Sequence, residues 1–408
     1  MAGVAGMIPL VSARAHVLER VGALPARRFD LAKTLGLVLA EPVFSSEPIP
    51  GFANTAMDGY ALRADDTRGA PVELDVVGTI GAGDDGSVHV GVGQAARIMT
   101  GAPIPDGADA VVKVELTHLL DGSENRVRVE ATVKPGNHVR NPGEDVAAGE
   151  QVLEPGTVVT PGRVGLLAAV GAYEVAAHRR PRVGVLSTGD ELADSAGRLR
   201  WGQIRDTNRH TLLGLVAEAG FEGVDLGIVR DHPDDIERAF RSGVANCDAV
   251  LSSGGVSMGD FDYVKVVLDR IGDMRWMQIA IKPAKPFAFG IVEGVPVFGL
   301  PGNPVSSMVS FELLAKPALR AMAGFAPSDL GPETVRAISD DDLSHRNDGK
   351  THYVRVAATR DERGVLHVTR SGGQGSHQLA AMTRADGLAA VPDGVVVSAG
   401  DPVDVILL

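Results

Sequence analysis

The pattern of apolar and polar positions divides the chain into stretches of different character. Between residues 51 and 140, short apolar runs such as 72–77 and 110–116 are separated by Gly, Pro and Asp clusters, which is typical of a small β-rich domain. From 179 to 325, apolar runs of four to six residues lead into a polar loop and then into a helix. This repeated alternation predicts an α/β domain with a mostly parallel sheet.

The segments on either side of the β-rich stretch share a different residue pattern, which favours short helices. Residues 8–22 and 30–46 predict short helices, and an Ala, Leu and Val run predicts another over 162–171. We therefore interpret 1–50 and 141–178 as one discontinuous, elongated domain into which 51–140 is inserted. The last segment, 326–408, has short β runs with frequent Gly and Asp and predicts a C-terminal β-barrel-like domain or a sandwich. The expected fold class is multidomain α/β plus β.

Composition excludes several classes of protein. The 408 residues carry a formal net charge of −13, so nucleic acid is not an expected partner. A single cysteine, Cys247, allows no internal disulfide, and we interpret it as a core residue rather than a nucleophile. Apolar runs are too short to cross a membrane, and the N-terminus lacks the features of a signal peptide. We expect a cytoplasmic protein with no membrane partner.

The polar loops that follow the apolar runs between 183 and 300 are the expected binding site. In open α/β sheets, ligands bind beyond the carboxyl ends of the strands. Gly backbone N–H groups and hydroxyls suit phosphate. One such loop alone is more often a plain turn, but several loops on one sheet edge favour a binding site. The candidate substrate-binding residues in these loops are Ser187, Thr188, Gly189, Asp190, Ser253, Gly254, Gly255, Ser257, Pro301, Gly302 and Asn303.

Charged side chains in the same region suggest a metal ion and an oxyanion. Asp190, Glu191, Asp260 and Asp262 could hold Mg²⁺ beside a phosphate, although Asp260 and Asp262 could instead cap a helix. Lys282 and Lys285 stand in the proline-rich stretch 281–286. Prolines stiffen this stretch, which favours a compact positive site for a small oxyanion over a pair of solvated lysines.

Several longer motifs point to one family. Residues 56–61 read AMDGYA, 99–105 read MTGAPIP, 252–263 read SSGGVSMGDFDY and 371–377 read SGGQGSH. Together they resemble the MoeA family over nearly the whole chain. The resemblance implies that the α/β domain binds molybdopterin and that the discontinuous domain dimerises. It also implies that the enzyme is a molybdopterin molybdenumtransferase, which inserts molybdate into adenylylated molybdopterin and releases AMP, with Mg²⁺ or another divalent cation.

The same resemblance implies a site shared between two subunits of a homodimer. Asp58 and Thr100 would come from the partner subunit. Arg355 and Ser376 would reach in from the C-terminal domain. The other catalytic residues would lie in the receiving cleft, and they are Glu191, Asp231, Asp262, Lys282 and Lys285. Glu191, Asp262 and Asp58 would hold the metal.

Other functions remain open from the sequence. A molybdopterin adenylyltransferase uses a similar α/β domain, but it would consume ATP and need no segment carrying AMDGYA. A nucleotide pyrophosphatase of the same α/β fold would differ in the substrates that it hydrolyses. A non-enzymatic scaffold is a third possibility, and it is disfavoured because the chain carries no second domain of this type.

Overall fold

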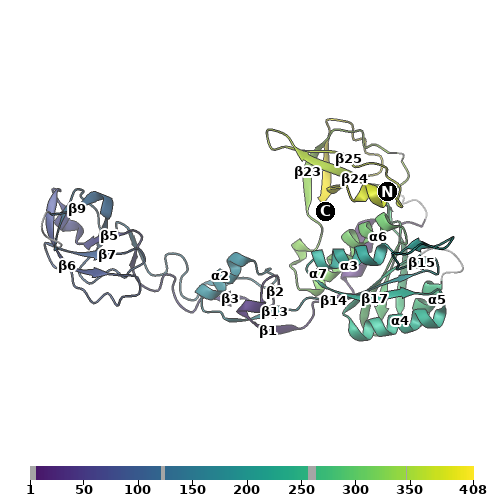
Figure 1. Ribbon diagram of the computed structural model, residues 1–408, viewed down its shortest axis with the longest axis horizontal. Coiled ribbons are helices and arrows are strands. Elements are labelled where there is room, and N and C mark those ends of the chain that lie inside the picture. The colour runs from purple at the N-terminus through teal and green to yellow at the C-terminus, as the bar shows by residue number, and fades with distance from the viewer. Residues whose placement is uncertain (1–5, 121–124, 256–262, 346) are drawn as a thin grey trace.

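The computed structural model describes residues 6–120, 125–255, 263–345 and 347–408. The described chain is elongated (Figure 1), with the β-rich domain at one end, the α/β and C-terminal domains at the other, and a narrow domain between them. Three of the predicted polar residues, Ser257, Asp260 and Asp262, lie outside the described residues.

The α/β domain is built on a mixed, mostly parallel sheet, as predicted. The strands run in the order β17 (Glu222–Val229), β14 (Arg182–Thr188), β18 (Ala249–Ser253), β22 (Val295–Leu300), β21 (Pro286–Val292) and β19 (Asp273–Gln278). The first four of these are parallel, and β21 is antiparallel to both of its neighbours. Strand β18 is buried along its whole length, as expected for a strand that helices cover on both faces.

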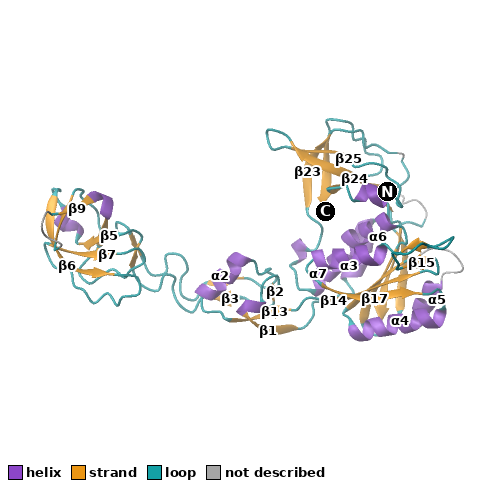
Figure 2. Cartoon of the chain, viewed as in Figure 1, coloured by secondary structure: helices purple, strands orange, loops and turns teal. Residues whose placement is uncertain are grey.

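Helices cover both faces of this sheet (Figure 2). One face carries α3 (Asn208–Glu218), α6 (Pro304–Ser310), the π-helical turn η4 (Phe311–Ala315) and α7 (Lys316–Met322), and the other carries α4 (Pro233–Asn246) and α5 (Tyr263–Ile271). Ile236, Phe240 and Val244 recur every fourth residue of α4 and are buried against the sheet.

The first helix, α1 (Leu10–Leu18), packs against α7 and η4. Its buried residues Ala13 and Val17 join the main core of the α/β domain. Residues 10–18 therefore contribute to this core, whereas the sequence prediction assigned them to the discontinuous domain.

The narrow middle domain is formed from two distant segments. A small sheet has the order β1 (Ala26–Asp30), β13 (Glu174–His178) and β2 (Val38–Leu39), and a second pairs β3 (Val43–Phe44) with β12 (Gln151–Leu153). Helix α2 (Pro161–Ala169) covers them through Leu167. The helix predicted over 30–46 is wrong. Only the 3-10 turn η1 (Leu31–Lys33) forms as a helix here, because Val38 and Leu39 are buried in the strand β2 that pairs with β13.

The β-rich domain follows. Its main sheet has the order β8 (Ala110–Lys113), β5 (Gly59–Leu62), β7 (Gln94–Ile98), β6 (Val72–Ile80), β10 (Arg126–Val129) and β9 (Thr117–Leu119). It also contains the 3-10 turns η2 (Ala64–Thr67) and η3 (Val114–Leu116). Beside this sheet, β4 (Asn54–Thr55) pairs with β11 (Val139–Arg140). The segment by which the chain enters this domain is therefore hydrogen-bonded to the segment by which it leaves.

The C-terminal domain is a closed barrel, which confirms the barrel prediction. Its strands are β23 (Thr334–Ser339), β24 (Thr351–Arg360), β25 (Leu366–Arg370), β26 (Gly387–Val391) and β27 (Pro402–Leu407). The barrel closes because β24 pairs with both β25 and β26. Strand β20 (Ile281–Lys282) of the α/β domain adds to β24 in parallel. Lys282 is therefore attached to the barrel, and this attachment positions the lysine segment between the two domains.

The remaining elements are short. The loop after β14 carries the pair β15 (Leu192–Ala193) and β16 (Ile204–Arg205), the turn η5 (Pro327–Asp329) leads into the barrel, and α8 (Leu379–Met382) follows β25. Within the described residues, every helix is too short or too polar to traverse a lipid bilayer.

Candidate active site

The polar loops predicted to bind substrate meet at one edge of the α/β sheet. They follow the carboxyl ends of β14, β17, β18 and β22, which are parallel neighbours. A Cβ atom on Gly254 would lie 3.0 Å from the carbonyl oxygen of Thr188, so the loops after β14 and β18 touch. The carboxylate of Asp190 accepts a long hydrogen bond of 3.4 Å from the backbone N–H of Asp231, which joins the loops after β14 and β17.

Asn208 connects two of these loops. Its amide group donates hydrogen bonds of 2.7 Å to the Ser253 hydroxyl and 2.7 Å to the Gly302 carbonyl oxygen. Asn208 is the first residue of α3 and is buried. The sequence analysis did not single out Asn208, because nothing along the chain reveals a contact with residue 302.

The hydroxyl of Ser187 forms a hydrogen bond within the protein. It donates a 3.0 Å hydrogen bond to the carboxylate of Asp206, which also accepts a 2.9 Å bond from Arg209. Arg209 is 3% exposed and forms further ion pairs with Asp194 and Asp225. Ser187 therefore fixes the loop that follows β14 instead of offering its proton to a ligand.

The predicted lysine pair lines a cavity of about 710 Å³ at the junction of the α/β and C-terminal domains. Ala284, between the two lysines, has a positive φ of 74°, so the backbone turns sharply there. The cavity brings together Lys282, Lys285, Asn303 and Ser376 from the predicted set, and it adds residues that the prediction of site residues left out. Those additional polar residues are Ser306, Lys350, Gln374 and His377.

Arg355 supports the loop that presents Ser376 to this cavity. Its guanidinium donates hydrogen bonds of 2.6 Å to the carbonyl of Gly373 and 3.1 Å to the carbonyl of Gly375. The Arg355 side chain is 1% exposed, and its Nε has no hydrogen-bond partner. No salt bridge reaches Arg355 in the part of the chain that the structure describes, and burial lowers its pKa. The arginine positions the loop and leaves an uncompensated positive charge behind the cavity.

The predicted carboxylates lie apart from the lysine cavity. Glu191 and Asp231 are exposed in loops of the same sheet edge. A Cβ atom on Gly189 would lie 2.6 Å from a carboxylate oxygen of Glu191, so only glycine leaves room for the acid to fold back over the loop.

Asp58 and Thr100 form a second cluster in the β-rich domain. The carboxylate of Asp58 accepts hydrogen bonds from the backbone N–H of Thr100 at 2.6 Å and from its hydroxyl at 2.7 Å. These bonds lower the pKa of Asp58, which is exposed. In Figure 1, β5 and β7, which adjoin these residues, lie at the opposite end of the molecule from α6. One subunit therefore does not bring Asp58 to its own lysines.

Comparisons with known proteins cover almost the entire chain. Family models match for the MoeA N-terminal region, domains I and II, over residues 8–171, for a probable molybdopterin binding domain over 184–321, and for the MoeA C-terminal region, domain IV, over 340–408. Two relatives named molybdopterin molybdenumtransferase and molybdopterin molybdenumtransferase 2 come from Haemophilus influenzae and Mycobacterium tuberculosis. Each is 38% identical, and the alignments cover 93% and 95% of this chain and 93% and 96% of the relatives.

A solved structure has the same overall fold. The molybdopterin biosynthesis MoeA protein of Pyrococcus horikoshii aligns with 98% of this chain and 100% of its own length, at 29% identity and a TM-score of 0.82. The similarity therefore extends to all of the domains described above.

Proposed function

Since the chain belongs to the MoeA family, we propose that the cavity at Lys282 and Lys285 binds the molybdate that this enzyme transfers. The relatives over nearly its full length are molybdopterin molybdenumtransferases, so this protein is an enzyme of molybdenum cofactor biosynthesis. We assign adenylylated molybdopterin as its second substrate and AMP as a product. The single cysteine supports a reducing, cytoplasmic location.

The observation that carries the proposal is the collection of positive groups around one cavity. Lys282 and Lys285 line it together with the Ser376 hydroxyl, and so does Lys350, whose ammonium is paired with Asp348. Arg355 adds an uncompensated charge behind the loop. A small tetrahedral oxyanion suits such a set of cations and hydroxyl donors. The local charge opposes the overall net charge of −13, so the cavity attracts an anion that the rest of the surface repels.

The pterin substrate would lie along the neighbouring loops. Asn303 lines the lysine cavity, and Asn208 joins the preceding residue, Gly302, to Ser253. A phosphate on these glycine-rich loops would accept hydrogen bonds from their backbone N–H groups. This arrangement would hold the substrate sulfurs beside molybdate, so that proximity supplies much of the rate.

The protein itself offers no sulfur to the reaction. Cys247 is buried, and burial raises the pKa of its thiol. A protonated, enclosed thiol is a poor nucleophile and a poor metal ligand. The sulfurs that take up molybdenum would therefore come from molybdopterin.

A divalent cation such as Mg²⁺ fits the carboxylates of the proposed site. Glu191 and Asp58 offer exposed oxygen donors, which are the ligands that Mg²⁺ prefers. We propose that Glu191 holds the ion together with Asp58 of the partner subunit. Asp262, the third proposed ligand, lies outside the described residues. When bound, the ion would neutralise charge on the pyrophosphate that joins AMP to the pterin.

We also propose that the enzyme works as a homodimer. Asp58 and Thr100 lie at the far end of their own subunit from the lysine cavity. A symmetric dimer would bring the β-rich domain of each subunit to the cavity of the other. Both active sites would then be shared.

The test is incubation of the purified enzyme with adenylylated molybdopterin, molybdate and Mg²⁺. The proposal predicts molybdenum cofactor and AMP in equal amounts, with both depending on molybdate. An adenylyltransferase would instead consume ATP without molybdate, and a general pyrophosphatase would hydrolyse other nucleotides. Either of these results, without molybdate-dependent cofactor formation, would overturn the proposal.

A further inference from the structure

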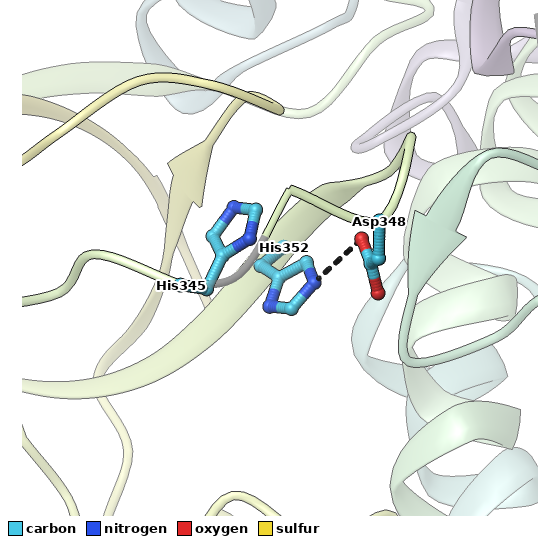
Figure 3. A group of neighbouring side chains, drawn as sticks. All are labelled: His345, Asp348 and His352. Atoms are coloured by element: carbon cyan, nitrogen blue, oxygen red, sulfur yellow. Dashed lines mark hydrogen bonds and ion pairs between the residues drawn. The ribbon is translucent and has the colours of Figure 1, made fainter.

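A second cluster of metal-ligating side chains lies beside the lysine cavity. His345 and Asp348, in the segment before β24, lie close to His352, near the start of β24, and Figure 3 shows His352 directed at Asp348. One donor atom from each lies within 4.8 Å of the others. They line a separate cavity of about 310 Å³, which shares Lys282 with the cavity described above.

Two of the three donors already have the spacing of a metal site. The Asp348 Oδ1 and His352 Nε2 atoms are 3.2 Å apart. Two ligands at about 2.0–2.1 Å from a tetrahedral zinc ion would be about 3.3 Å apart. The third donor, on His345, needs a side-chain movement of no more than about 2 Å to complete the set.

The neighbouring groups orient these donors as the outer ligands of metal sites do. The Nε2 atom of His345 lies 3.1 Å from the carbonyl oxygen of Val391. A carbonyl oxygen only accepts, so the Nε2 N–H of His345 donates this hydrogen bond. Lys350 donates a 2.8 Å hydrogen bond to the other carboxylate oxygen of Asp348, which holds that carboxylate in place.

The imidazole rings of His345 and His352 lie against each other. They stack at 3.4 Å with an interplanar angle of 4°, an arrangement that two imidazolium cations would oppose. Stacked rings direct their lone pairs in parallel, so metal binding would open the stack.

We propose that His345, Asp348 and His352 form a binding site for a divalent transition metal such as zinc. Two imidazoles and one carboxylate suit zinc and its neighbours in the transition series, whereas Mg²⁺ and Ca²⁺ prefer oxygen donors. The site is separate from the Mg²⁺ site proposed above. Because Lys282 is paired in register with His352, an ion here would add positive charge next to the oxyanion cavity.

The test is metal binding by the tag-free, full-length enzyme after treatment with a chelator. Equilibrium dialysis against Zn²⁺ should give one tightly bound ion per chain, and Co²⁺ should give the visible absorption bands of a low-symmetry site. Excess Mg²⁺ should not displace either ion. The His345→Ala/His352→Ala double variant should lose the ion and the bands.

Two further variants keep the test decisive. Asp348→Asn retains the size of the side chain and should weaken Zn²⁺ binding at least tenfold. His367→Ala removes another histidine of the barrel, one that pairs with Asp340, and should leave the stoichiometry at one. Absence of a stoichiometric ion in the unaltered enzyme would overturn the proposal, as would unchanged binding in folded double and Asp348→Asn variants.

Discussion

The guanidinium of Arg355 lies 2.6 Å from the carbonyl oxygen of Gly373. A buried arginine is usually paired with a carboxylate, but this one gives its hydrogen bonds to neutral backbone carbonyls. Its charge is therefore not cancelled locally. The same side chain shapes the loop carrying Ser376 and contributes positive potential to the cavity that the loop lines.

Replacing Arg355 with Met should destabilise the C-terminal barrel. Each hydrogen bond from a charged group contributes about 1.5–3 kcal/mol, and removal of a buried charge offsets part of the loss. We expect a net destabilisation of about 1–3 kcal/mol, measured by calorimetry. The matched control is Arg336→Met in the same barrel, whose exposed pair with Asp404 should contribute less than about 1 kcal/mol. Equal stability of the Arg355→Met variant and the unaltered enzyme would contradict the role given to Arg355.

Thr100 should keep Asp58 ionised. Hydrogen bonds from Thr100 lower the pKa of Asp58, so their stabilising effect is present above the ordinary aspartate pKa and is lost as the pH falls through the lowered value. In Thr100→Val the pKa of Asp58 should rise, because the hydroxyl donor is gone, while Thr100→Ser should retain the low value. Titration of the Asp58 carboxyl by NMR measures both. The same pKa in the Val and Ser variants would show that the hydroxyl does not act on Asp58.

Cys247 should be dispensable for catalysis. Its side chain is buried, and burial raises the pKa of the thiol. Alkylating reagents should therefore modify the native enzyme slowly at pH 8, and denaturation should accelerate the reaction strongly. Cys247→Ala should keep the turnover of the unaltered enzyme. A large fall in turnover without a fall in stability would assign the thiol a chemical role.

Asn208 should matter for both stability and substrate binding. Asn208→Ala removes hydrogen bonds to Ser253 and Gly302, and the loss of these buried partners should cost about 1–3 kcal/mol. Since the two loops would then separate, the KM for the pterin substrate should rise. Asn246→Ala is the control, since Asn246 is exposed at a helix end and its side chain donates to the Ser242 carbonyl of the same helix. If the Asn208→Ala variant is destabilised but keeps a normal KM, the contact between the two loops does not affect substrate binding.

Periodicity was sufficient to predict the α/β domain. Strands such as β22 are apolar from end to end, and α4 buries every fourth residue, so local pattern and tertiary structure agree. The helix predicted over 30–46 was wrong because the apolar residues Val38 and Leu39 are buried through pairing with β13, more than 130 residues away. A window along the chain contains no sign of that partner.

Only those residues of the candidate site that stand in a recognisable sequence motif could be predicted. Proline spacing marked Lys282 and Lys285, and the structure brings both to one cavity with Asn303 and Ser376. Gln374, which stands in the SGGQGSH motif, and Lys350 also line the cavity, but Lys350 stands among ordinary loop residues without a distinguishing pattern. Their place depends on the pairing of β20 with β24, a contact between two domains that local sequence does not encode.

The shared active site is tested most directly by mixing two inactive subunits. One carries Asp58→Ala, the other carries Lys282→Ala with Lys285→Ala, and each alone should lose molybdate-dependent AMP release. In a mixed dimer, one site would combine intact lysines with an intact Asp58 of the partner subunit. Coexpression at equal levels should therefore restore about one quarter of the unaltered activity, since about half the dimers are mixed and each has one intact site. No recovery in purified mixed dimers would show that Asp58 and the lysines do not act across the dimer.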